Sequence, residues 1–391
     1  MTDLLVIGGG PAGATCARRA ALNGLDVTLI EKQRYPRPKP CGGALSPRVI
    51  SELDFDISHL YQCKFSSAKI HRPSGKVSTL TRENLEAHLI QRSAFDKFLI
   101  DKAEEAGAEV VTENEIVAIE QLRSGIRALG MGDSYKAQLL VGADGVNGIT
   151  AKELGIRRGW SPENIAVCIN AEVTLDHSPE KQESFVDIFY GFVEWGYGWF
   201  FPGANSANIG LGCRLDKAAG LRNKWEPFLS KLALTKEIEV KVLEKTSARV
   251  PLGGLPGRII GRRSMLVGDA AGLVSPISGE GISFAIESGI LAADVAFEAV
   301  QMKSPSQVVQ YDRRMKQQYL NELKDLRSLA GILYKSESNL ELIFDLIDKD
   351  RALREYFTDI FVRITPYSKM KYKIAKRLLS KHPRAAIKLG F

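Results

Sequence analysis

Three glycines near the start of the chain have the spacing of a phosphate-binding turn. Gly8, Gly10 and Gly13 form a Gly-x-Gly-x-x-Gly pattern that follows the apolar run 4–7 and opens a helical pattern. Gly8 permits a tight turn, Gly10 lets the backbone approach a pyrophosphate, and Gly13 allows close packing between helix and strand. The positive N-terminal end of the helix attracts phosphate groups. The segment therefore predicts a dinucleotide-binding βαβ unit.

An acidic residue follows this turn at the distance that such a unit requires. The apolar run 27–30 ends at Glu31, roughly twenty residues after the glycines, where a carboxylate can accept hydrogen bonds from a ribose diol. Strand, glycines, helix, second strand and acid all occur in order. A chance glycine-rich turn is therefore the weaker interpretation.

Two acidic segments much later in the chain narrow the cofactor to FAD. Asp144 and Asp269 each follow an apolar run, and Gly279 and Gly281 then open a long apolar helix at Ile282. In this order the three segments resemble the fingerprints of the para-hydroxybenzoate-hydroxylase-like superfamily of flavoproteins. The resemblance implies that Asp269 binds the ribityl hydroxyls and that the helix start faces the flavin pyrimidine. The positive helix end would there stabilise the anionic reduced flavin.

The same resemblance implies further cofactor contacts. Arg92 would pair with the pyrophosphate, with a surface arginine at a helix start as the alternative, and Ile116 would contact adenine through its backbone. The segment at Asp144 departs from the usual pattern, with Gly148 and Ala151 where Ser and Arg are common. The other expected contacts with FAD are Ala12, Lys32, Cys41, Gly42 and Ala44.

Two segments outside the fingerprints have the composition of a reaction pocket. Lys39-Pro-Cys-Gly-Gly43 exposes backbone, so that it could pass close to a flat ring and place the Cys41 thiol near the reactive flavin edge. In the middle of the chain, aromatic side chains alternate so that they would share one face of a strand towards a cavity. They are Trp195, Tyr197, Trp199 and Phe201. The competing interpretations are a plain sheet core for the aromatics and simple packing for Cys41.

Together, the KPCGG and YxWxFP segments resemble the geranylgeranyl reductase family, although Glu194 stands where that family often has Pro. The resemblance implies an FAD-dependent enzyme that saturates isoprenoid double bonds, most directly those of geranylgeranyl membrane lipids. Chlorophyll or menaquinone side chains are the alternative substrates. Cys41 and Tyr197 are the candidate catalytic residues, and Cys41, Tyr197 or a water could supply the proton. A second Gly-x-Gly-x-x-Gly turn is absent from the sequence, so transient NAD(P)H or a ferredoxin-like protein could supply electrons.

Two other functions compete on the same fold. An FAD-dependent aromatic monooxygenase would consume oxygen but would not be expected to carry both KPCGG and YxWxFP. A prenyl escort of the Rab-GDI kind keeps the glycine turn without the flavin, and intact Asp269 and the Gly-Glu-Gly segment argue against it.

These motifs require a nucleotide-binding fold that the chain enters, leaves and re-enters. Ser93 to Asp96 predicts a capping box at a helix start, and the run 110–119 predicts a strand. The predicted fold class is α/β: a Rossmann-like FAD-binding domain interleaved with an antiparallel β-sheet substrate domain, plus a helical C-terminal region. The expected FAD-binding domain comprises 1–75, 84–160 and 255–305, the substrate domain 76–83 and 161–254, and the helical region 306–391.

The composition fits a globular protein of the cytoplasm. Hydrophobic residues make up 45% and charged residues 25% of the chain. No apolar run reaches the roughly eighteen residues that predict a transmembrane helix, and no basic and apolar leader precedes the first strand. The cysteines form no CxxC pair, which favours a reducing compartment and argues against a metal site or disulfide framework. They are Cys16, Cys41, Cys63, Cys168 and Cys213.

The net charge of +7 belongs to the C-terminal end. Residues 360–391, here called the basic tail, hold nine Lys or Arg and no Asp or Glu, so the rest of the chain carries about −2. Met370, Ile374 and Leu378 lie four residues apart in this tail, the pattern of an amphipathic helix at an anionic membrane surface. We therefore expect peripheral membrane association rather than nucleic-acid binding. A solvated basic helix or an RNA-binding end is the alternative.

Overall fold

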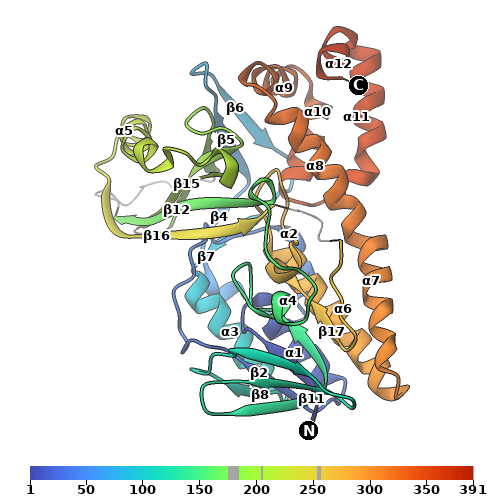
Figure 1. The fold of residues 1–391 in the computed structure, drawn as a ribbon. Helices are drawn as coiled ribbons and strands as arrows, with labels where there is room; N and C mark the ends of the chain where they lie inside the picture. The colour runs from blue at the N-terminus through green and yellow to red at the C-terminus, as the bar shows by residue number, and fades with distance from the viewer. Residues whose placement is uncertain (175–184, 204–205, 253–256, 391) are drawn as a thin grey trace.

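The computed structural model describes residues 1–174, 185–203, 206–252 and 257–390 (Figure 1). An α/β lobe surrounds the N-terminus, and a second lobe built on a β-sheet lies beside it. The C-terminal helices run along one side of both lobes (Figure 1). The predicted fold class is confirmed.

The first lobe is built on parallel strands flanked by helices. β1 (Thr2–Ile7) is parallel to β2 (Val27–Ile30) and to β11 (Ser134–Gly142), and β11 is parallel to β17 (Ser264–Leu266). Helix α1 (Pro11–Leu22) continues from the glycine turn and packs on the long apolar helix α6 (Ile282–Gln301) and on α3 (Arg92–Glu105). The other elements are β8 (Glu109–Val111), β9 (Ala118–Gln121), β10 (Ile126–Leu129) and α4 (Thr150–Glu153).

The strand predicted over 110–119 is wrong in its extent. β8 pairs with β2 at one edge of the sheet, whereas β9 pairs with β10 at the opposite edge. The polar residues between β8 and β9 connect the two edges of the sheet. Glu113 in this connection adopts a left-handed φ of 58°, which ends the extended conformation of β8.

The capping box predicted from Ser93 to Asp96 is also wrong. Helix α3 begins at Arg92 after Gln91, without a side-chain cap. The Asp96 carboxylate is fully buried and instead binds the Arg92 guanidinium, at 2.9 and 3.0 Å. Leaving a buried carboxylate without a charged partner costs more free energy than leaving a helix end without a side-chain cap.

The second lobe is a sheet with the strand order β16-β12-β15-β14-β13-β5-β6. Neighbours are antiparallel except β5 and β13. Helix α5 (Trp225–Lys236) covers one face through Trp225 and Phe228. The strands are β5 (Ser67–His71), β6 (Val77–Thr81), β12 (Ile165–Thr174), β13 (Phe185–Phe189), β14 (Gly196–Pro202), β15 (Ser206–Arg214) and β16 (Lys241–Pro251). A small sheet of β3 (Ala44–Leu45), β4 (Tyr61–Phe65) and β7 (Ala87–Ile90), with α2 (Pro47–Glu52), lies between the lobes.

The domain boundary expected after residue 75 is wrong. The chain enters the second sheet at Ser67, because β5 and β6 form one hairpin and both strands belong to that sheet. Alternating burial of Ala68 and Ile70 fixes this register. The other domain limits stay predictions.

The C-terminal region is helical, as predicted. It comprises α7 (Val308–Met315), α8 (Asn321–Leu333), α9 (Glu337–Lys349), α10 (Arg351–Phe361), α11 (Tyr367–Lys381) and α12 (Pro383–Leu389). Helices α9 and α10 pack on β6. Within the described ranges, no helix has the length and hydropathy needed to cross a membrane.

Helix α11 is amphipathic, but its apolar face is covered by protein. Met370, Ile374 and Leu378 are 4%, 9% and 3% exposed and join the main hydrophobic core. The expectation that these three side chains face a membrane is therefore wrong. The periodic pattern was real, but neighbouring helices cover that face.

Candidate active site

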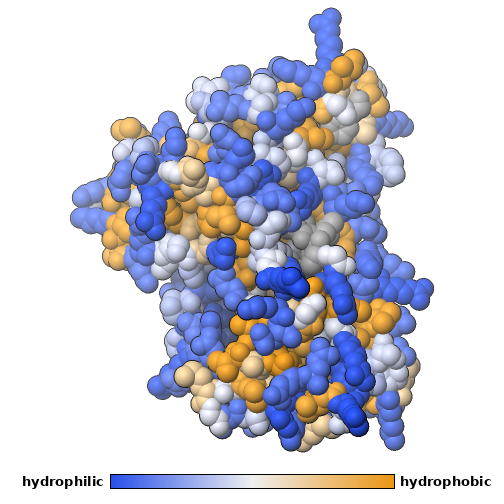
Figure 2. Space-filling view, viewed as in Figure 1, coloured by the Kyte–Doolittle hydropathy of each residue, from blue (hydrophilic) through white to orange (hydrophobic). Residues whose placement is uncertain are grey.

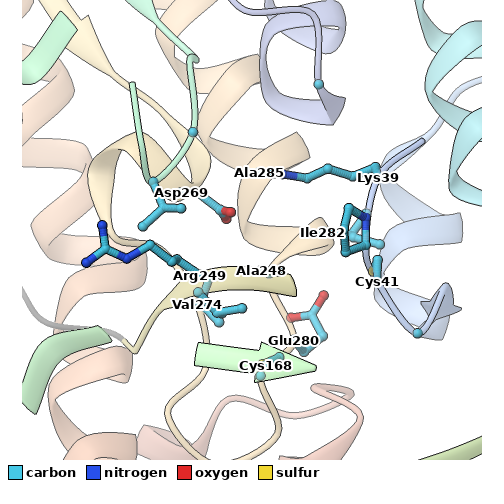
Figure 3. A pocket seen from close by; sticks show the side chains of 18 of the residues that line it. Lys39, Cys41, Cys168, Ala248, Arg249, Asp269, Val274, Glu280, Ile282 and Ala285 are labelled. Atoms are coloured by element: carbon cyan, nitrogen blue, oxygen red, sulfur yellow. The ribbon is translucent and has the colours of Figure 1, made fainter. Parts of the chain in front are cut away.

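One pocket between the lobes, with a cavity volume of about 530 Å³, brings the distant motifs together. Its lining includes all but one of the residues expected to bind the cofactor: Gly8, Gly10, Ala12, Glu31, Lys32, Cys41, Gly42, Ala44, Arg92, Ile116, Asp144, Asp269, Gly279, Gly281 and Ile282. The exception is Gly13. Figure 3 shows the Asp269 turn, the Cys41 loop and strands of the second sheet around the same space.

The glycine turn has the geometry of a phosphate cradle. Gly8 has a φ of +100°, a conformation that favours glycine. A Cβ on Gly13 would lie 1.8 Å from the Gly8 carbonyl oxygen, so Gly13 acts through packing of α1 on the turn. This is the role that the sequence predicted for it.

Glu31 holds the turn as well as lining the pocket. One carboxylate oxygen accepts a hydrogen bond from the Gly9 N–H at 2.8 Å, and the other accepts from the Gln33 N–H at 3.1 Å. The side chain is nearly buried. It can still present lone pairs to the pocket, because a carboxylate has about four acceptor positions.

Two buried arginines stand beside the cradle, and sequence reasoning found only one. Arg92 is 9% exposed, which excludes the alternative of a surface arginine. Arg37 lies 3.3 Å from Asp96 and 3.8 Å from Glu31, and its Nε has no partner among the described residues. Both arginines line the pocket. The only sequence signal for Arg37 was its place between prolines shortly after Glu31.

Asp144 fits a polar ligand. One oxygen accepts from the Thr150 backbone N–H and hydroxyl, at 2.8 and 2.7 Å. The other is buried without a partner in the described part of the chain, and burial raises the pKa of this carboxyl. A Cβ on Gly148 would lie 2.0 Å from the Asp144 carboxyl carbon. The departure from the family pattern at Gly148 thus lets the Asp144 side chain occupy this position.

The turn before α6 is held by two tyrosines from other elements. Tyr197 on β14 donates its hydroxyl hydrogen to the Ser278 carbonyl, and Tyr334 after α8 donates to the Ile277 carbonyl at 3.1 Å. Gly279 follows with a φ of +67°. Burial raises the pKa of both tyrosines well above its ordinary value. Tyr334 had no local sequence signal.

The four alternating aromatic side chains all line the pocket, as predicted, but only three of them lie on one strand. Tyr197, Trp199 and Phe201 belong to β14, whereas Phe200 points into the core beneath α5. Trp195 precedes the strand with a left-handed φ of 52°. The Trp199 indole N–H donates to the Asn208 side chain at 2.9 Å.

The KPCGG loop lies against this aromatic wall. A Cβ on Gly42 would lie 2.4 Å from the Phe201 ring. Gly42 is therefore required for a close approach to this aromatic ring of the protein itself. The Cys41 thiol lines the pocket, and its sulfur accepts from the Gly43 N–H at 3.4 Å.

A family model described as an FAD-binding domain matches residues 1–295. A geranylgeranyl diphosphate reductase of Rhodobacter capsulatus is 31% identical over 94% of this chain and 95% of the relative. The chain belongs to the geranylgeranyl reductase family of FAD-binding proteins.

Other members of the family are similar over most of their length. A digeranylgeranylglycerophospholipid reductase of Methanococcoides burtonii is 30% identical, over 89% of this chain and 85% of the relative. The crystal structure of a geranylgeranyl bacteriochlorophyll reductase-like protein of Thermoplasma acidophilum superimposes with a TM-score of 0.85 at 26% identity. The match covers 100% of this chain and 98% of the other. The resemblance found in the sequence is confirmed.

FAD is the cofactor of this reductase, and the pocket fits it. The glycine turn offers the α1 N-terminus to a pyrophosphate, with Arg92 and Arg37 beside it. The partnerless oxygen of Asp144 and the partnerless Nε of Arg37 are unused hydrogen-bonding groups. The individual contacts of these residues with FAD stay predictions.

Proposed function

We propose that this enzyme saturates the carbon–carbon double bonds of geranylgeranyl chains, most directly in membrane lipids. The aromatic wall of β14 carries the proposal, because it lines the same pocket as the three FAD fingerprints. The names of the relatives support it, since they include digeranylgeranylglycerophospholipid and geranylgeranyl diphosphate reductases. Chlorophyll or menaquinone side chains are the alternative substrates.

The residues of the pocket suit a reaction that excludes water. An isolated alkene has no carbonyl to stabilise charge, so positioning in a dry site matters more than it would for an activated substrate. Reduced FAD, when bound, supplies the hydride. Trp199 is fixed by Asn208, and Trp195 stacks on Tyr334 with ring centroids 5.6 Å apart. Phe361 and Val362 add apolar surface from the C-terminal helices.

The decisive experiment is a single turnover without oxygen. The purified protein is reduced with dithionite and mixed with a digeranylgeranylglycerol phospholipid. We expect the yellow oxidised spectrum to return and the lipid to gain two mass units per double bond. A flavin that is reoxidised by oxygen alone would indicate a monooxygenase and contradict the proposal. Geranylgeranyl diphosphate and a menaquinone, tested in parallel, identify the preferred chain.

We propose NAD(P)H or a ferredoxin-like protein as the electron donor. The sequence has one Gly-x-Gly-x-x-Gly turn, which the FAD site uses, so a nicotinamide would bind transiently. Anaerobic bleaching of the flavin by NADPH, by NADH or by a reduced ferredoxin distinguishes these donors. Failure of all three would contradict the assignment.

We also propose that the enzyme lies in the cytoplasm and contacts an anionic membrane through the outer face of α11 and α12. Tyr372, Leu379 and Ile387 on this face are 75%, 55% and 77% exposed. Exposed basic residues lie among them, and Figure 2 shows hydrophobic and hydrophilic side chains mixed over this end of the molecule. Apolar contacts and charge attraction would act together, at about 1 kcal/mol per basic residue near the surface.

Vesicle sedimentation tests the membrane contact. We expect binding to phosphatidylglycerol vesicles, little binding to phosphatidylcholine vesicles, and loss of binding when Lys373, Lys376 and Lys388 are replaced by glutamate. Replacing Lys136, Lys152 and Lys231 in the same way is the matched control for net charge. Equal loss in both triple variants, or binding to RNA in place of vesicles, would contradict a specific membrane face.

A further inference from the structure

Glu280 is a carboxylic acid in the pocket wall for which the FAD fingerprints provide no role. It lies between Gly279 and Gly281 and lines the pocket that also contains Cys41 and Cys168 (Figure 3). One carboxylate oxygen accepts from the Ser283 N–H at 2.8 Å, and the other is 2.9 Å from the Ser283 hydroxyl. Both contacts fix the side chain in one orientation.

A buried charge network stands behind this carboxyl. Arg363, just after α10, donates to the Ser283 hydroxyl at 2.6 Å and to Glu287 at 2.7 Å, and it lies 3.4 Å from Glu322. Because Ser283 Oγ accepts from Arg363, its own hydrogen is directed towards Glu280. The network therefore positions Glu280 from the side remote from the pocket.

The other acids of the pocket are less suited to give up a proton. The Tyr197 hydroxyl hydrogen is already donated to the Ser278 carbonyl. Burial raises the pKa of Cys168 to about 12 and that of Cys213 to about 11. Cys41 is the exception, because an N–H donated to its sulfur does not hold the thiol proton, and the Glu280→Gln variant distinguishes these two donors.

We propose that Glu280 is the proton donor of the reduction, an inference that rests on the proposed function. Hydride from reduced FAD forms a C–H bond at one alkene carbon, and the Glu280 carboxyl proton forms a C–H bond at the other. The C=C π bond is lost, FAD is oxidised by two electrons, and Glu280 is left as a carboxylate that water reprotonates. The carboxyl must therefore be protonated before the reaction.

The surroundings favour that protonated state. Burial raises the pKa of Glu280, while Arg363 and the hydrogen bonds from Ser283 lower it and the charge of Glu287 raises it again. The net direction is upward. The pocket lining also holds Cys41, Cys168 and Tyr197, and it includes the cations Lys39 and Arg249 (Figure 3). Among the cations, Arg363 lowers the pKa of Glu280, and burial outweighs it. The proton is thus held below the raised pKa and lost above it, so the rate should fall as the pH rises through that value.

Glu280→Gln tests the proposal in the reduced holoenzyme. We expect reoxidation by the geranylgeranyl lipid to slow about 10²- to 10⁴-fold and to lose the pH dependence of the wild type, while FAD affinity stays within a few-fold. Glu280→Asp should recover part of the rate. Glu226→Gln, on the exposed face of α5, is the matched control and should behave as the wild type.

Infrared spectroscopy gives a readout that does not depend on turnover. The wild type should show a protonated carboxyl band that persists to a higher pH than that of an exposed glutamate, disappears in parallel with the rate, and is missing in Glu280→Gln. A Glu280 that is ionised at a pH where the enzyme is fully active, or lipid reduction by Glu280→Gln at the wild-type rate, would overturn the proposal. A wild type that shows the band but reduces no prenyl lipid would instead contradict the proposed function.

Discussion

Replacing Tyr197 by Phe separates a role in positioning from a role in proton transfer. The tyrosine hydroxyl is buried and donates to the Ser278 carbonyl, next to the turn expected to face the flavin. Removing it leaves that carbonyl without its partner, at a cost of about 1 to 3 kcal/mol. If the whole cost falls on the ordered turn, FAD should bind about 5- to 150-fold more weakly.

The assay compares FAD titration with single-turnover reduction at saturating FAD. We expect weaker FAD binding, with the rate of lipid reduction within a few-fold of the wild type. Tyr334→Phe removes the neighbouring hydrogen bond to Ile277, which at 3.1 Å is of ordinary length, and should produce a smaller effect in the same direction. Tyr356→Phe, on α10 and outside the pocket lining, is the control.

The opposite pattern would refute this reasoning. If Tyr197→Phe binds FAD normally but reduces the lipid at least about 10²-fold more slowly, the hydroxyl supplies the proton. That result would also remove Glu280 from the mechanism, since one turnover needs one proton.

Three further outcomes follow from the structure. Gly13→Ala should abolish FAD retention on gel filtration, because its Cβ would lie 1.8 Å from the Gly8 carbonyl oxygen; a yellow, stable variant would contradict the packing role. Arg363→Met should lower the free energy of unfolding in urea by up to about 3 to 5 kcal/mol, because the buried Glu322 loses the guanidinium while Glu287 keeps Arg48 at 2.6 Å. A change within error would mean that water replaces the guanidinium. Asp350 binds Arg377 and His382 of the basic tail, and these contacts lower its pKa to about 2. Its contribution to stability is therefore present above its ordinary pKa near 3.8 and is lost as pH falls towards 2. In Asp350→Asn, the free energy of unfolding should fall less steeply between about pH 4 and pH 2, and an unchanged slope would exclude this carboxyl.

Local patterns predicted the parts of the site whose roles depend on a few neighbouring residues. The spacing of Gly8 and Gly13 describes a turn and its packing, and the alternation from Trp195 to Phe201 describes one strand face. The turn was found where the sequence placed it, and so was the strand face, except that Trp195 precedes the strand. The strand over 110–119 and the capping box at Ser93 were also predicted from local patterns, and both predictions were wrong. Tertiary contacts determine the structure there, since Asp96 binds the Arg92 guanidinium and does not cap the helix.

The parts of the site that the sequence did not reveal come from contacts between distant segments. Arg37 becomes a site residue through Asp96, and Tyr334 through the Ile277 carbonyl. Neither has a neighbour in sequence that suggests this role. The basic tail is a further example. The sequence periodicity predicts that α11 has an apolar face, but it does not predict whether protein or a membrane covers that face.

The C-terminal helices therefore help to form the candidate active-site pocket as well as a proposed membrane contact. Helix α11 packs on α8, and Tyr334, which follows α8, holds the turn before α6. Arg363, just after α10, fixes Ser283 at the start of α6. A buried ion pair adds little net stability compared with apolar packing, but it disfavours any arrangement that separates its partners. The network around Arg363 thus holds the segment that carries Phe361 against the pocket, while α11 continues from it to the proposed lipid surface.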